Sequence, residues 1–223
     1  MNITTGIVDV HHDDGGYDLA HAAELGLVAL VHKCTEGKDW RDPACEAALG
    51  AAQALGLLTG AYHFGSASAP GVVQADWFLQ HARPGDLLAL DLEHNPGSSG
   101  TMSTAEAAAF CQHVFDHTGR WPVFYAGLAD LRNRMATVDA ASRAILAQCP
   151  LWLAAYGPDP ARTTPPAPWS SWSLMQYTNG ADGPFDRVLY PRATAGFKRT
   201  AQDRSCFRGT ADELRAWWST VGS

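Results

Sequence analysis

The stretch Leu87–Glu93 reads LLALDLE, a run of aliphatic residues that ends in two carboxylates. Turn-forming prolines and glycines flank it at residues 84–85 and 95–97, and the space between them fits a short buried strand better than a helix. Successive side chains of a strand point to opposite faces. Asp91 and Glu93 should therefore share one face, with Cα atoms about 6.5 Å apart, while the leucines beside them hold the other face.

Two neighbouring acids at the end of an apolar strand have two interpretations. Each carboxylate raises the pKa of the other, which is how a carboxyl group stays protonated near neutral pH for use as a general acid. The same pair can instead cap a turn or belong to a structural ion-pair network. The pair alone leaves both interpretations open.

Composition limits the class of protein. The chain has 223 residues, of which 46% are hydrophobic, and its net charge is −7 with a pI near 5.6. Such a chain forms one large or two small globular domains and lacks the basic surface that binds nucleic acid or anionic membranes. We expect no signal peptide and no membrane insertion. An odd number of cysteines, five, without metal-type spacing predicts buried free thiols.

Apolar runs alternate with helical patterns along most of the chain. Predicted strands cover residues 6–10, 27–32, 57–64, 87–93, 121–126, 151–156 and 172–177, and predicted helices cover 17–24, 43–55, 72–82, 103–117, 128–135, 140–147 and 210–218. The proline-rich residues 158–168 predict a loop, and residues 178–204 a polar, irregular segment. Seven strands mostly separated by helices predict an α/β barrel with parallel strands.

Polar side chains gather at the ends of these strands. The set comprises Asp9, Lys33, Glu36, Tyr62, Asp91, Glu93, Tyr125, Tyr156 and Gln176. All stand at or just past a carboxyl end, the face on which such barrels build their sites. So many polar groups at one face predict a single cleft.

One loop, at residues 11–14, contains histidines and acids of the kind that bind metals. The loop His11-His12-Asp13-Asp14 offers four potential ligands of two types, but neighbours on a strand face opposite sides and no other His/Cys pair completes a ligand set. We therefore interpret it as a polar loop ended by glycine and predict neither a metal nor a cofactor. His63 is expected to be a hydrogen-bonded core histidine.

These strand ends resemble those of glycoside hydrolase family 25, the Chalaropsis-type lysozymes. The resemblance rests on Asp9 in GIVDV, KCTEG at 33–37, GAYHF at 60–64, DLE at 91–93, LWLAAY at 151–156 and QYT at 176–178. Order and spacing agree from about residue 6 to residue 218. The resemblance implies a single catalytic domain over residues 1–223 and an irregular, flattened (β/α) TIM-like barrel with shortened or missing helices in its C-terminal half.

The resemblance also implies an activity and a set of residues. The reaction would be hydrolysis of the β-1,4 bond between N-acetylmuramic acid and N-acetylglucosamine in peptidoglycan, with Glu93 as proton donor, Asp91 beside it and Asp9 across the cleft. A fourth acid fits Asp203 better than Asp186, because Gly209-Thr210 and a helix follow only the former. Residues expected to bind the glycan are Tyr62, Tyr125, Trp152, Tyr156, Gln176 and Glu36.

Three positions depart from the family pattern. Met175 stands where a tryptophan is frequent, which predicts a thinner sugar platform, His11 replaces a serine, and Cys34 replaces an alanine. None of these changes removes a carboxylate.

The sequence leaves several alternatives open. Water could be activated by Asp203 or Asp9, or the 2-acetamido group of the substrate could attack with Asp91 orienting it. Rival functions are a chitinase-like hydrolase of N-acetylglucosamine polymers and a non-catalytic glycan-binding barrel. We expect a monomer that is made in the cytoplasm and acts on the wall after release, either as a phage or prophage endolysin or through a specialised secretion machine.

Overall fold

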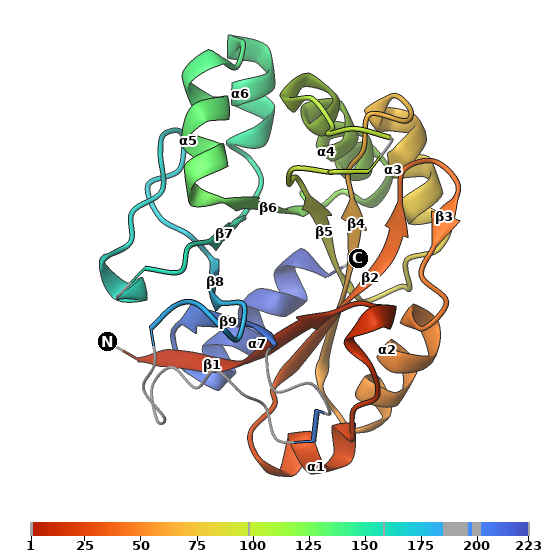
Figure 1. The fold of residues 1–223 in the computed structure, drawn as a ribbon, viewed down its shortest axis with the longest axis vertical. Helices are drawn as coiled ribbons and strands as arrows, with labels where there is room; N and C mark the ends of the chain where they lie inside the picture. The colour runs from red at the N-terminus through yellow and green to blue at the C-terminus, as the bar shows by residue number, and fades with distance from the viewer. Residues whose placement is uncertain (1, 98, 158, 185–195, 198–201, 223) are drawn as a thin grey trace.

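Eight strands close into a barrel in the computed structural model, which describes residues 2–97, 99–157, 159–184, 196–197 and 202–222 (Figure 1). The barrel strands are β1 (Ile3–Val10), β2 (Ala29–Glu36), β4 (Leu58–Phe64), β5 (Leu87–Asp91), β6 (Val123–Gly127), β7 (Leu151–Ala154), β8 (Leu174–Thr178) and β9 (Asp203–Arg208). Their order around the barrel is β1-β9-β8-β7-β6-β5-β4-β2, and pairing of β1 with β2 closes the ring. The two-residue β3 (Trp40–Arg41) adds to the end of β2.

The prediction of seven parallel strands was wrong in one respect. Seven strands run parallel to one another, but β9 is an eighth, and it runs antiparallel to both β8 and β1. Its sequence, DRSCFR, carries no aliphatic run, because two arginines and a serine interrupt it. Arg204 is nevertheless buried, and its guanidinium donates to the Tyr177 hydroxyl (3.1 Å) and to the Thr5 carbonyl (3.1 Å). Hydrogen bonding of this kind makes a polar strand compatible with burial.

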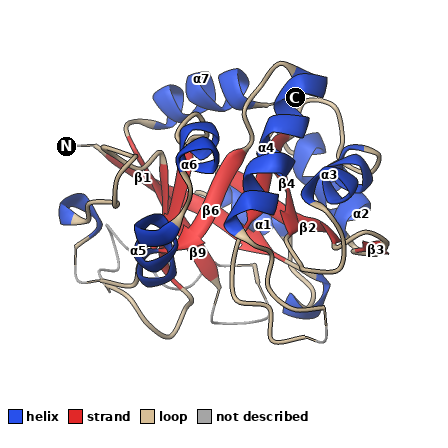
Figure 2. Cartoon of the chain, turned by 90° about the horizontal axis from the view of Figure 1, so that it is seen from above, coloured by secondary structure: helices blue, strands red, loops and turns tan. Residues whose placement is uncertain are grey.

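Helices cover the barrel unevenly, as Figure 2 shows. They are α1 (Leu19–Glu24), α2 (Cys45–Ala54), α3 (Gly71–Leu79), α4 (Thr104–Thr118), α5 (Leu128–Thr137), α6 (Ala140–Leu146) and α7 (Ala211–Val221). Within the described residues, the connection from β7 to β8 holds only a short 3-10 helix, η2 (Pro160–Arg162), inside the predicted proline-rich loop. The barrel is therefore irregular, with its helical cover reduced after β7. None of the described helices combines the length and apolarity needed to cross a bilayer.

Alternation along β5 separates two apolar layers. Leu87 and Ala89 pack inside the barrel, whereas Leu88, Leu90 and Leu92 pack in the layer between barrel and helices. The predicted alternation of side chains along this stretch is confirmed, and because of it Asp91 and Glu93 point toward the barrel mouth. At the opposite end, α7 closes the barrel.

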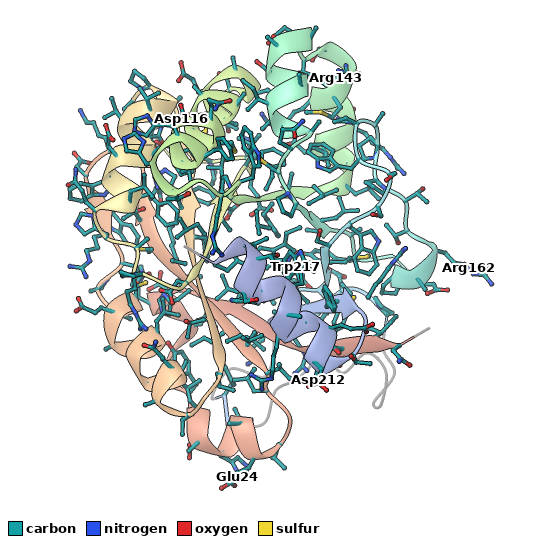
Figure 3. All side chains as sticks on the ribbon, turned by 180° about the vertical axis from the view of Figure 1, so that it is seen from behind. Glu24, Asp116, Arg143, Arg162, Asp212 and Trp217 are labelled. Carbon is teal, nitrogen blue, oxygen red and sulfur yellow. The ribbon has the colours of Figure 1, made fainter. Side chains whose placement is uncertain are left out.

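Helix α7 crosses the barrel bottom, where Asp212 and Trp217 are labelled in Figure 3. Its buried Trp218 packs with the barrel interior and donates its indole N–H to the Thr59 carbonyl (2.9 Å). The helix begins with the predicted capping box between Thr210 and Glu213. With the bottom closed, the open end of the barrel is the one that carries the acids.

Several smaller predictions can be compared with the structure. All five cysteines are free and buried, as predicted. Buried His63 contacts the Thr35 hydroxyl (2.8 Å) and the Gln74 amide oxygen (3.1 Å), which fits a structural histidine, and burial lowers its pKa to about 4. Met175 is fully buried in the layer facing the helices. The prediction that it thins the sugar platform is therefore wrong, because its side chain points away from the barrel mouth.

Leu90→Ala should test the packed layer behind the acids. Because Leu90 has no exposed surface, the change leaves a cavity and should cost about 2–5 kcal/mol of unfolding free energy. Urea unfolding measures it, with Leu25→Ala as the matched control, since Leu25 is 61% exposed and should change stability by less than about 0.5 kcal/mol. Equal losses for the two variants would contradict the assignment of Leu90 to the core.

Candidate active site

A pocket of about 500 Å³ opens at the carboxyl ends of the barrel strands. Its lining comes from all eight barrel strands, from loops that follow them, and from β3. The lining residues are Asp9, His11, His12, Asp13, Lys33, Glu36, Trp40, Tyr62, Phe64, Asp91, Glu93, Tyr125, Trp152, Gln176 and Asp203. All four acids singled out in the sequence lie in this one pocket.

The acids reach the pocket from distant parts of the chain. Asp9 comes from β1 and is paired in register with Asp203, the first residue of the antiparallel β9. Asp91 ends β5, and Glu93 follows two residues later on the same face. The reversed direction of β9 is what brings its first residue, rather than its last, to the barrel mouth. Asp186, the weaker alternative to Asp203, lies outside the described residues.

A chain of hydrogen bonds joins the two sides of the pocket. The Gln176 amide oxygen accepts from the hydroxyls of Tyr125 (2.9 Å) and Tyr156 (2.7 Å), and the Gln176 amide nitrogen donates to Asp9 Oδ2 (2.9 Å). The Tyr125 hydroxyl also lies 3.4 Å from Glu93 Oε1. Since the hydroxyl has one proton and the Gln176 contact is shorter, the bond to Glu93 is weak. Gln176 thereby fixes the position of Asp9 and orients Tyr125 beside Glu93.

Burial and mutual repulsion disfavour ionisation of these acids. Burial, then the charges of Asp203 and Glu93, hold the pKa of Asp9 well above its usual range, although the Gln176 hydrogen bond opposes them. Burial and then Glu93 do the same for the pKa of Asp91, against the nearby Lys33. The pocket therefore favours at least one protonated carboxyl group.

Glu93 also has a raised pKa, but a different neighbouring charge contributes to it. Burial is the largest cause of its raised pKa, the hydrogen bond from Tyr125 lowers that pKa, and the charge of Asp130 raises it. The sequence had suggested two causes for this raised pKa, repulsion from Asp91 and the apolar strand. In the structure desolvation comes first, because Glu93 stands at the edge of an apolar barrel wall.

One wall of the pocket combines a cation with aromatic rings. The Lys33 ammonium group pairs with Glu36 (2.6 Å) and lies 4.8 Å from the Trp40 ring centroid and 4.6 Å from that of Phe64. Asn95 donates to the other Glu36 oxygen (3.2 Å). Of these residues, Trp40 and Phe64 were not anticipated from the sequence as site residues. Trp40 lies in a two-residue strand too short to give a pattern, and only its pairing to the end of β2 brings it to the mouth.

The predicted aromatic residues occupy different places. Tyr62 and Tyr125 line the pocket, and Trp152, almost fully buried, sits edge-on to Tyr125 (5.0 Å) and donates to the Ser205 hydroxyl (2.8 Å). Tyr156, 40% exposed, lines a second hollow of about 490 Å³. Glu93 lines both hollows. The two hollows thus share Glu93 in their walls, and together they are called the groove.

The histidine loop at the pocket rim is a short 3-10 helix, η1 (His12–Asp14), rather than an extension of the strand. His11 caps it by accepting from the Asp13 N–H (3.3 Å), and His12 Nδ1 contacts the buried Asp42 (3.0 Å). The argument from strand alternation was wrong, because His11, His12 and Asp13 place potential ligand atoms within 4.8 Å of one another. Their local hydrogen bonds nevertheless account for this arrangement as a polar, capped loop.

Comparisons with known proteins agree with this geometry. The family model described as "Glycosyl hydrolases family 25" matches residues 8–184. Lysozyme M1 of Streptomyces globisporus is 29% identical over 212 residues, which cover 86% of this chain and 70% of that protein. The uncharacterized protein YegX of Escherichia coli K12 is 28% identical over 188 residues, which cover 83% of this chain and 61% of YegX.

Solved structures share the same barrel. A muramidase from Acremonium alcalophilum superposes with a TM-score of 0.76 at 25% identity, covering 95% of this chain and 97% of that one. A bacterial lysozyme from Streptomyces coelicolor gives a TM-score of 0.78 at 24% identity, covering 96% and 97%. The family model spans most of the chain and includes the end of β1 and every other strand of the barrel except β9. The chain belongs to glycosyl hydrolases family 25.

Proposed function

We propose that this chain is a muramidase, which hydrolyses the β-1,4 bond between N-acetylmuramic acid and N-acetylglucosamine in peptidoglycan. Membership of the family and similarity to proteins named lysozyme and muramidase support the substrate. The observation that carries the proposal is the convergence of four acids on one pocket, with Glu93 at the centre of the groove. Glycosidic cleavage needs two carboxyl groups in different ionisation states, and crowding of acids in a buried site favours such a difference.

Glu93 is proposed as the general acid. Its raised pKa favours the protonated form that a general acid needs, and its position between the two hollows puts it where a glycosidic oxygen would lie if sugars occupied both. Protonating that oxygen makes the leaving sugar a neutral alcohol. Tyr125, itself hydrogen-bonded to Gln176, limits the positions that the Glu93 carboxyl can take.

The second reacting centre is the anomeric carbon of N-acetylmuramic acid, and we propose that three acids act there: Asp91, Asp9 and Asp203. In the described residues Asp91 Oδ1 and Asp9 Oδ1 are buried without a hydrogen-bond partner. Buried acceptors normally find donors, and the N–H of a 2-acetamido group is a suitable one for Asp91. This supports the route in which the acetamido group attacks, while Asp9 and Asp203 stabilise developing positive charge and take up the proton of water.

The remaining contacts suit a neutral glycan. Aromatic rings of Tyr62, Trp40 and Tyr156 offer flat surfaces at the groove of the type that packs against sugar rings. Glu36 and Gln176 offer hydrogen-bonding groups there. We further propose that the protein acts as a monomer, since every residue of the proposed site belongs to one chain, and that it acts at the cell wall, where this substrate occurs.

Glu93→Gln should lower the rate of reducing-end release from peptidoglycan by about 10²–10⁴-fold, since that is the usual contribution of a general acid. The control is Glu24→Gln, because the Glu24 side chain is 79% exposed on α1. Chitin, assayed in parallel, should yield little product with wild type or with either variant. A Glu93→Gln variant with wild-type rate would remove Glu93 from the acid role, and preferential cleavage of chitin would overturn the substrate.

Asp130→Asn should move the alkaline limb of the kcat/KM profile to lower pH. The general acid must be protonated, so activity is lost as pH rises through the pKa of Glu93. Asp130 raises that pKa, and removal of its charge should lower it. The profile is measured at low ionic strength to limit screening, with Asp116→Asn as control because Asp116 is exposed on α4. A limb that stays in place or moves upward would contradict this prediction.

Asp91→Asn should raise the stability of the fold near neutral pH while it lowers activity. The pKa of folded Asp91 lies above its usual value, so the wild-type fold loses stability as pH rises from that usual value through the folded pKa. Asparagine avoids the ionisation. The urea midpoint of the variant should exceed that of wild type at neutral pH, and the difference should shrink toward pH 4. A variant less stable than wild type at neutral pH would count against the buried-charge argument.

A further inference from the structure

A second group of potential ligands lies away from the acidic pocket, on the surface formed by helices α3 and α4. These helices lie side by side in both Figure 1 and Figure 2. Asp76 of α3 faces His113 of α4, with 2.7 Å between Asp76 Oδ1 and His113 Nε2. His117 follows one turn later, and its ring centroid is 4.0 Å from that of His113. The three residues place one potential ligand atom each within 4.8 Å of one another.

Helix spacing explains why the two histidines meet. Residues at i and i+4 lie on the same face of a helix, so His113 and His117 project together. Two imidazoles in this arrangement and one carboxylate form the N,N,O ligand set that binds zinc and its neighbours in the first transition series.

The tautomer of His117 suits metal binding. Its Nδ1 lies 2.8 Å from the His113 carbonyl oxygen, and because a carbonyl can only accept, Nδ1 must carry the proton. In the neutral ring the lone pair is then on Nε2, and His117 is exposed. A ligating histidine is usually oriented in this way, with its other nitrogen donating to a backbone carbonyl.

His113 provides the second nitrogen and Asp76 the oxygen. Their hydrogen bond requires a proton on His113 Nε2, because a carboxylate accepts. A metal ion can replace that proton and keep both residues in contact. The side chains are 20% and 55% exposed, respectively, so an ion can enter from solvent and retain water in its remaining coordination positions.

The helices hold the site rigidly. Phe78 of α3 and Phe110 of α4 are fully buried and stack with centroids 5.9 Å apart. At the beginning of α3 the Gly71 N–H donates to the Glu106 carboxylate (2.5 Å), and a Cβ at Gly71 would lie 2.0 Å from the Glu106 carbonyl oxygen. Backbones that approach so closely do not slide easily, so the ligands are preorganised.

We propose that Asp76, His113 and His117 form a surface site for a divalent ion of the late first transition series, such as Zn²⁺, Ni²⁺ or Cu²⁺. The ion links α3 to α4. It takes no part in glycan cleavage, because none of its three ligands lines the pocket that holds the acids. Binding therefore stabilises the folded protein rather than changing the reaction.

The test is calorimetric titration of the whole, chelator-treated protein with ZnCl₂ near neutral pH in a buffer that does not bind zinc. His117→Asn and Asp76→Asn should each weaken the binding at this site at least about tenfold, since loss of even an outer-shell partner typically costs a metal site 10–100-fold. The matched controls are His21→Asn and Asp116→Asn. His21 is an exposed histidine on α1, and Asp116, labelled in Figure 3, is an exposed acid next to His117.

Thermal unfolding provides the second readout. Zinc should raise the melting temperature of wild type and of both controls, and should raise it less in His113→Asn/His117→Asn. Calorimetric titration of each variant beside its control also separates this site from His11 and His12, because all four single variants retain those two histidines. Wild-type affinity and stoichiometry in both His117→Asn and Asp76→Asn, or no zinc binding by wild type, would overturn the proposal.

Discussion

The site depends on the hydrogen bonds of one amide, that of Gln176. Its oxygen accepts from two tyrosine hydroxyls and its nitrogen donates to Asp9, so it joins β1, β6 and β8 across the barrel mouth. With both tyrosines bound to the oxygen, the nitrogen can only point toward Asp9, which leaves Asp9 as an acceptor. The same network places Tyr125 beside Glu93. A network satisfied in this way fixes the geometry of acids that would otherwise repel one another.

Burial raises the pKa values of these acids and makes their ionised forms costly in folding free energy. Desolvation is the largest cause of the raised pKa of Asp9, Asp91 and Glu93. The apolar layer behind β5 and the cap formed by α7 maintain that burial, because they keep the barrel closed except at the mouth. No described residue donates a hydrogen bond to Asp9 Oδ1 or Asp91 Oδ1, so both oxygens can accept from a substrate.

The sequence predicted the features that follow from local pattern. Alternation in Leu87–Glu93 predicted which residues face the mouth, and the succession of strands and helices predicted the α/β barrel. Long-range pairing could not be predicted in the same way: β9 lacks an aliphatic run, and its antiparallel direction follows only from its fit between β8 and β1. Trp40 reaches the pocket through a two-residue strand, and Met175 points outward because of strand parity. Asp203 was reached through the family resemblance, since no local pattern distinguishes it.

Mass spectrometry of the muropeptides released from purified peptidoglycan tests the central claim most directly. The fragments are reduced with borohydride before analysis, which labels whichever sugar carries the new reducing end. We expect reduced N-acetylmuramic acid at the ends of all new fragments, because Glu93 would protonate the oxygen that leaves with N-acetylglucosamine and water would then add to C1 of N-acetylmuramic acid. Reduced N-acetylglucosamine at the new ends, or cleavage confined to the peptide stems, would contradict it.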